Sequence, residues 1–145
     1  METVHKNIPQ ETQEARNGQR DRIEMLRSRV GLLAGKDRLL MTMYLENGNS
    51  FRQMARLAGV DETSIAKKIR KIAKRLIDGE YITCLRNRSR FSPAEMDVAR
   101  DYFLTRLSIR KIAEKRDTTY YGVRKILKKI EGLIAYSGQV KSFKF

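Results

Sequence analysis

Cysteine, histidine, tryptophan and proline are scarce or absent in this 145-residue chain, and these shortages exclude several classes of protein. With Cys84 as the single cysteine, neither an internal disulfide nor a cysteine-rich zinc site can form. The single histidine, His5, has no neighbours in the sequence with which to build a metal cluster or a catalytic triad. Two prolines and nine glycines are few for a chain of many turns and short strands. We therefore expect a mostly helical protein that is not an enzyme and uses no cofactor or metal.

Long apolar runs are also missing. No stretch approaches the roughly 20 residues that span a bilayer, and the polar N-terminal segment lacks the apolar core of a signal peptide. This predicts a cytoplasmic protein without a membrane partner. Hydrophobic residues still make up 41% of the chain, so a folded core is expected.

Positive charge is what the chain has in excess. It carries 31 Lys and Arg against 17 Asp and Glu, a formal net charge of +14. Two runs without any acidic residue hold much of it: AKKIRKIAKR over residues 66–75 and RKILKK over residues 124–129. Apolar residues recur within both runs at helical spacing. A charge run is often only a solvated helix face, but an excess of this size favours an anionic partner.

The two basic runs belong to an internal repeat with an offset of 58 residues. The aligned positions keep their chemical type, as in the pairs Ser50/Ser108, Arg52/Arg110, Ala55/Ala113, Ile65/Val123, Ile69/Leu127, Ile72/Ile130 and Leu76/Ile134. The chain therefore contains one supersecondary unit twice.

Each unit is predicted to contain three helices. In the first unit they span residues 36–46, residues 51–58 after an N-cap at Ser50, and a longer segment after an N-cap at Asp61. Gly59 ends the second helix, and the small Ala55 allows the second and third helices to cross closely. Two helices joined by so short a turn are typical of a helix-turn-helix.

The second unit repeats this pattern with changes in its turn. Ser92 and Glu95 predict a capping box at its first helix, Ser108 caps its second helix, and Thr118 or Thr119 caps its third. Asp117 stands where the first unit has a glycine, and Arg116 where it has an apolar residue, which predicts a looser turn.

The sequence thus predicts an all-α fold of two tandem three-helix helix-turn-helix units plus an N-terminal helix. We expect a disordered polar tail over residues 1–20, the N-terminal helix and first unit over 21–78, a basic linker over 79–92, the second unit over 93–136 and a tail over 137–145. A stripe of Ile23, Leu26, Val30 and Leu33 marks the N-terminal helix. We expect this stripe to pack on the first unit, with a homodimer contact as the alternative; the oligomeric state is left open.

The first unit, from Leu33 to Leu76, resembles region 4 of bacterial sigma factors, which is the region that binds the promoter −35 element. The resemblance is greatest to sigma factors of the extracytoplasmic-function group. The similarity rests on Lys36-Asp37-Arg38, Ser50, Met54-Ala55, Gly59-Val60 and the stretch from Ser64 to Leu76. Phe91 to Ile134 is a weaker copy, and nothing here resembles the sigma regions that melt the −10 element and grip core polymerase. The resemblance implies two region-4-type DNA readers in tandem.

In a helix-turn-helix, the third helix lies in the major groove. When the apolar stripe faces inward, the residues expected at base edges are Glu62, Thr63, Ala66, Lys67 and Arg70 in the first unit, and Tyr120, Tyr121, Arg124, Lys125 and Lys128 in the second. The two sets differ chemically, which predicts two non-identical subsites on the DNA.

Contacts to the DNA backbone are expected from the starts of the second helices and from flanking cations. The candidates are Ser50, Arg52, Lys71, Lys74, Arg75, Arg86, Arg88, Arg90, Ser108, Arg110 and Lys129. A simple helix cap explains each serine equally well, and a solvated charge explains each lysine. The β-prone segment from Tyr81 to Leu85 is interpreted as a short strand or, preferably, an extended linker whose arginines follow the DNA. Cys84 is expected to be a small buried residue rather than a redox sensor.

These features predict a sequence-specific double-stranded DNA-binding protein, a bacterial transcriptional regulator associated with the nucleoid, that reads two adjacent major-groove subsites. One alternative is a protein-interaction module that contacts RNA polymerase or another regulator. The other is an architectural DNA binder of low specificity.

Overall fold

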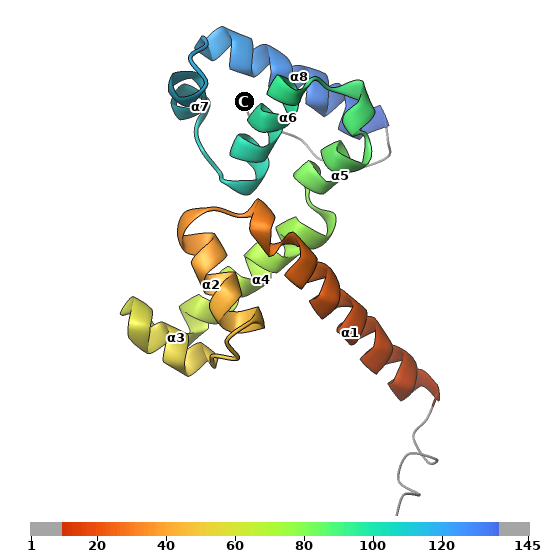
Figure 1. The fold of residues 1–145 in the computed structure, drawn as a ribbon, viewed down its shortest axis with the longest axis vertical. Coiled ribbons are helices and arrows are strands. Elements are labelled where there is room, and N and C mark those ends of the chain that lie inside the picture. Colours follow the sequence, from red (N-terminus) through yellow and green to blue (C-terminus); the bar gives the residue numbers. More distant parts are fainter. Residues whose placement is uncertain (1–9, 137–145) are drawn as a thin grey trace, which may run out of the picture.

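The computed structural model describes residues 10–136, which form helices and no strand (Figure 1). The α-helices are α1 (Gln10–Arg29), α2 (Gly35–Leu45), α3 (Phe51–Ala58), α4 (Glu62–Asp78), α5 (Glu80–Arg86), α6 (Pro93–Ala99), α7 (Ile109–Lys115) and α8 (Tyr120–Tyr136). Shorter elements are the 3₁₀ helices η2 (Val30–Leu32) and η3 (Arg88–Arg90) and the π-helix η4 (Arg100–Leu104). The predicted all-α fold class is confirmed.

The long helices α4 and α8 each form the centre of a group of helices, which we call the first unit (α2 to α4) and the second unit (α6 to α8, with η4). Helix α4 contacts α1, α2, α3 and α5, and α8 contacts α5, α6 and α7. All eight predicted apolar positions of these two helices are at most 3% exposed: Ile65, Ile69, Ile72, Leu76, Val123, Leu127, Ile130 and Ile134. Burial of each such side chain contributes about 1.5–3 kcal/mol, so these stripes hold the two units together.

The helix starts follow from local capping chemistry. At five of them a side-chain oxygen accepts a hydrogen bond from the backbone N–H three residues further on, at 2.7 to 3.2 Å. The capping residues are Ser50, Asp61, Ser92, Ser108 and Thr119. These caps were all predicted, and of the two candidate threonines the structure selects Thr119.

The 58-residue repeat is also present in the backbone dihedral angles. The first unit has a positive φ at Gly48 (66°) and Gly59 (71°), and the second unit has one at Arg106 (64°) and Asp117 (54°), each 58 residues later. A residue with a side chain pays roughly 1–2 kcal/mol for this left-handed conformation, which glycine adopts freely. The two units therefore share these two turn conformations, although only the second adopts them with strained residues. Their first helices differ, because η4 is a π-helix where α2 continues as an α-helix.

Residues 79–92 do not form the extended basic linker that we expected, because they contain α5 and η3. Tyr81, Ile82, Thr83 and Cys84 are buried in succession, since α5 contacts α4 in the first unit and α6, η4 and α8 in the second. A short helix that is buried on several sides shows the same apolar run as a buried strand, so the sequence pattern could not distinguish a helix from an extended segment. Burial raises the pKa of Cys84 to about 12, in keeping with its predicted role as a small buried residue.

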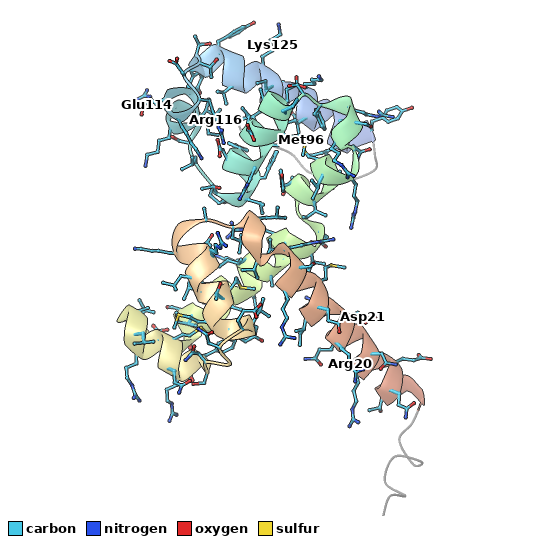
Figure 2. All side chains as sticks on the ribbon, viewed as in Figure 1. Arg20, Asp21, Met96, Glu114, Arg116 and Lys125 are labelled. Carbon is cyan, nitrogen blue, oxygen red and sulfur yellow. The ribbon has the colours of Figure 1, made fainter. Side chains whose placement is uncertain are left out.

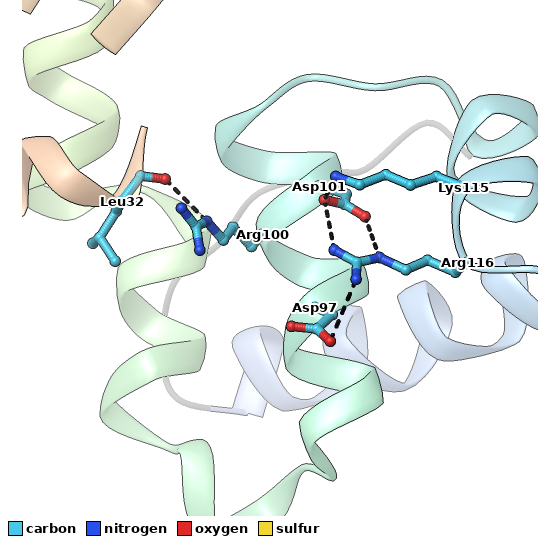
Figure 3. Close-up of polar contacts among 6 residues, drawn as sticks. All are labelled: Leu32, Asp97, Arg100, Asp101, Lys115 and Arg116. Atoms are coloured by element: carbon cyan, nitrogen blue, oxygen red, sulfur yellow. Dashed lines mark hydrogen bonds and ion pairs between the residues drawn. The ribbon is translucent and has the colours of Figure 1, made fainter. Parts of the chain in front are cut away.

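Two arginines join the units beside α5. Arg75 of α4 donates a hydrogen bond to the Leu104 carbonyl oxygen at 2.9 Å. Arg100 of η4 donates to the Leu32 carbonyl oxygen at 3.0 Å (Figure 3). Buried side chains from both units belong to one continuous hydrophobic cluster. The units thus form one body rather than two domains on a linker.

Helix α1 begins at Gln10, so the expected disorder is wrong for residues 10–20, while residues 1–9 and the 137–145 tail lie outside the described residues. The N-terminal part of α1 projects away from the rest of the molecule (Figure 1). Its other end packs against α2 and α4, where Leu26 is buried, as are Val30 in η2 and Leu33 after it. The predicted packing on the first unit is confirmed for these three side chains, and Ile23, the first residue of the predicted stripe, is partly buried.

The second unit contains a buried carboxylate, Asp101 of η4, which is 1% exposed. Lys115 Nζ lies 2.9 Å and Arg116 Nε 2.8 Å from its oxygens (Figure 3). Burial by itself raises the pKa of Asp101, but the hydrogen bonds and charges of Arg116 and Lys115 outweigh it, and the pKa lies below its ordinary value. In the repeat, Asp101 and Arg116 replace Met43 and Ala58, so polar bonding occupies positions that are apolar in the first unit.

Replacing Asp101 by asparagine should lower the free energy of unfolding by about 2 kcal/mol at neutral pH, because charge-assisted hydrogen bonds are lost. The Asp101 pKa is lower in the folded chain than in the unfolded chain. Its contribution is therefore fully present above the unfolded value of about 3.9 and disappears as the pH falls through the folded value. Urea denaturation should show the native chain losing more stability than the variant below about pH 4.

The matched control is Asp97→Asn. Asp97 is 55% exposed and lies 3.5 Å from Arg116, so its loss should change the free energy of unfolding by less than about 1 kcal/mol. Equal effects of the two substitutions would contradict a special role for Asp101.

Candidate nucleic-acid interface

The outer face of α4 carries most of the base-contact residues predicted for the first unit. Glu62, Thr63, Lys67 and Arg70 are all exposed. Lys67 and Arg70 form no ion pair with any described residue. This face therefore carries exposed positive charge that is not paired within the described residues.

Ala66 does not belong to this face, contrary to the prediction. It is only 7% exposed. On the helix it lies next to Ile65 and three residues before Ile69, at the edge of the apolar stripe, and its small side chain is covered there. Ala66 therefore has little exposed surface for the predicted contact with a base.

The corresponding face of α8 is also exposed but chemically different. Tyr120 and Tyr121 are 49% and 75% exposed, at the repeat positions of Glu62 and Thr63. Further along lie the exposed cations Arg124, Lys125 and Lys128, without an ion pair to any described residue. In Figure 2, Lys125 lies on the outer side of α8 and points away from the molecule. Two aromatic rings followed by cations thus replace the carboxylate and hydroxyl at the start of α4.

Two of the predicted backbone-contact residues are engaged within the chain instead. The Arg75 side chain is 17% exposed and pairs with Asp37 at 3.4 Å, in addition to its bond across the units. Lys129 Nζ lies 3.0 Å from both carboxylate oxygens of Glu95. Asp37 and Glu95 are equivalent in the repeat, so in each unit an acidic residue on the first helix is paired with a cation on the third.

The remaining predicted backbone-contact residues are exposed, and the two serines also act as helix caps. Ser50 and Ser108 accept hydrogen bonds from the backbones of α3 and α7. The exposed cations are Arg52, Lys71, Lys74, Arg86, Arg88, Arg90 and Arg110. Of these, Arg88 donates to the Leu85 carbonyl oxygen at 3.0 Å, and the three arginines after Leu85 lie at the end of α5 and in η3 rather than on an extended segment.

Sequence reasoning missed a cleft of about 840 Å³ between the two units. It is lined by the start of α2, by α4, by the start of α5 and by Thr105 and Arg106 after η4. These segments are far apart in the sequence, so no local pattern links them. One signal was available, because Arg106 occupies the repeat position of Gly48.

Two other kinds of site are absent from residues 10–136. In this part of the chain, no group of three His, Cys, Asp or Glu residues could hold a metal ion. None of its helices is both long and apolar enough to cross a bilayer. Comparisons with models of protein families, with curated proteins and with solved structures find no match for this chain.

Arg75→Ala and Lys74→Ala remove the same charge from neighbouring positions but should differ in their effect on stability. Arg75→Ala should lower the free energy of unfolding by about 1–2 kcal/mol, because it removes a hydrogen bond between the units and an ion pair with Asp37. Lys74 is exposed and unpaired, so its replacement should change stability by less than about 0.5 kcal/mol. Chemical denaturation measures both, and equal stabilities would contradict the joining role of Arg75.

Proposed function

We propose that this protein binds double-stranded DNA sequence-specifically as a bacterial transcriptional regulator acting at the nucleoid, with α3–α4 and α7–α8 as two helix-turn-helix pairs. The observation that carries the proposal is the presence of exposed, unpaired basic faces on α4 and α8, at equivalent positions of a repeat. The turns before these helices have three and four residues, as such pairs require. The net charge of +14 and the resemblance of the first unit to sigma region 4 support the same function.

In this proposal α4 and α8 read two different subsites in the major groove. Lys67, Arg70 and Arg124 donate to guanine acceptors, and Glu62 accepts from the cytosine amino group. The rings of Tyr120 and Tyr121 offer apolar contact to thymine methyl groups. Because α5 joins the two units in one body, the spacing between the subsites is expected to be constant.

Selection of bound duplexes from a random pool, followed by mobility-shift assays, tests this proposal. We expect one enriched bipartite motif with a fixed spacer. Affinity should fall by about 10³-fold between about 50 and 200 mM salt if six phosphates are contacted. A nearly flat salt response would overturn the proposal. Salt-dependent binding with no enriched motif would favour the architectural binder instead.

Variants on the two faces test the assigned base contacts. Lys67→Ala or Arg124→Ala should relax the preference at one position of its own subsite and cost about 1–3 kcal/mol for the selected sequence. Arg20→Ala is the control, because Arg20 is an exposed cation on the projecting part of α1 (Figure 2). An equal loss of affinity for all sequences would assign Lys67 and Arg124 to phosphates.

A second candidate function, contact with RNA polymerase or another regulator, is favoured by one apolar pair. Leu57 and Val60, at the turn between α3 and α4, are 74% and 48% exposed. Exposed apolar side chains of this size favour a contact surface where they form a contiguous patch. A complex with polymerase that survives nuclease and is lost in Leu57→Lys, with DNA binding retained, would support this candidate. Lysine is chosen because Lys115 occupies the equivalent position in the second unit.

A further inference from the structure

The cleft between the units has a positively charged lining. Its cations are Lys36, Lys68, Lys71, Lys74, Arg75 and Arg106, and its acidic residues are Asp37, Asp78 and Glu80. Lys68 and Arg75 both pair with Asp37, at 3.5 and 3.4 Å. The other four cations form no ion pair with any described residue. The cleft therefore keeps uncompensated positive charge from both units.

Arg106 contributes this charge from a strained backbone position. Its φ of 64° matches the 66° of Gly48 at the same position of the first unit. Glycine would relieve the strain at Arg106, yet the sequence has an arginine there, and its side chain lines the cleft. Backbone strain at a residue that lines a cleft is the starting point for a hypothesis of function. Asp117, the other described non-glycine residue with a positive φ, does not line the cleft.

We propose that the cleft is a binding site for a phosphate-bearing polyanion, held between Arg106 of the second unit and Lys36, Lys71 and Lys74 of the first. The guanidinium group donates two parallel hydrogen bonds to a phosphate, while lysines act as point charges around it. Protein walls on both sides strengthen these interactions relative to an open surface. The volume of about 840 Å³ lies in the range of small-molecule sites.

Occupancy of this site affects DNA binding if the proposed function holds. Lys71 and Lys74 line the cleft and are also among the exposed cations expected at DNA phosphates. A free polyanion in the cleft then competes with DNA for both lysines. Alternatively, the phosphate that enters the cleft belongs to the DNA strand itself. The chemistry of the site is the same in both cases, and the source of the phosphate is decided by experiment.

Thermal unfolding of the full chain with sodium tripolyphosphate, against sodium chloride at equal ionic strength, tests the site without DNA. Tripolyphosphate at ten times its Kd should raise the Tm by about 4 °C. Arg106→Gly should keep or raise the Tm without the anion, because it relieves the positive φ, and should raise the Kd for tripolyphosphate by about tenfold or more. Asp117→Gly is the matched control, since it relieves the other positive φ and Asp117 does not line the cleft.

A mobility-shift assay with the same two variants identifies the source of the phosphate. A tripolyphosphate response that Arg106→Gly abolishes and Asp117→Gly retains supports a free polyanion. No thermal response, together with DNA binding weakened by Arg106→Gly alone, supports a phosphate of the DNA backbone. Absence of both effects overturns the proposed site. Since the thermal assay contains no DNA, its result does not depend on whether the DNA-binding proposal succeeds.

Discussion

The arrangement of the whole molecule depends on the burial of α5 between the two units. A helix of seven residues is not stable by itself, so its contacts with both units must hold it in place. The four consecutive buried residues from Tyr81 to Cys84 supply those contacts. Arg75 and Arg100 then bind backbone carbonyl oxygens beside it. The single hydrophobic core, the relative position of α4 and α8, and the cleft between the units all follow from this packing.

The parts of the fold that sequence reasoning predicted are those specified by local chemistry. An N-cap involves only the side chain of a serine, threonine or aspartate and the backbone N–H of the third residue after it, so its signal is contained within four residues. The five caps from Ser50 to Thr119 follow this rule. The stripes on α4 and α8 depend only on helical periodicity. Helix α5 could not be predicted in this way, because its form is decided by what surrounds it. The start of α1 has no apolar stripe, so periodicity did not reveal that residues 10–20 are helical.

The properties of the candidate site also divide into those that sequence alone could predict and those that it could not. Exposure of Lys67, Arg70 or Lys125 follows from the position of each residue opposite a buried stripe, so sequence alone could place them. The ion-pair partners of these cations could not be predicted in this way. Whether a cation is free depends on an acidic residue elsewhere in the chain, and Asp37 and Glu95 engage Arg75 and Lys129 from helices more than 30 positions away. The repeat held a usable hint, because both units place an acidic residue at the same position of the first helix.

The two units share their buried stripes and two turn conformations, but not the whole backbone path, because η4 is a π-helix where α2 is α-helical. The buried stripes of α4 and α8 correspond position by position, and so do the positive φ angles of Gly48 and Arg106 and of Gly59 and Asp117. The exposed positions that differ include Arg106, which lines the cleft, and Tyr120 and Tyr121, which begin the exposed face of α8, while Asp101 in place of Met43 is a buried difference. Buried positions are restrained by packing, whereas these exposed positions are free to change unless a ligand requires them. Since Arg106 even carries backbone strain, stability of the fold does not account for it. The two binding sites that we propose give both changes a reason, and a second copy that only repeated the first would need neither change.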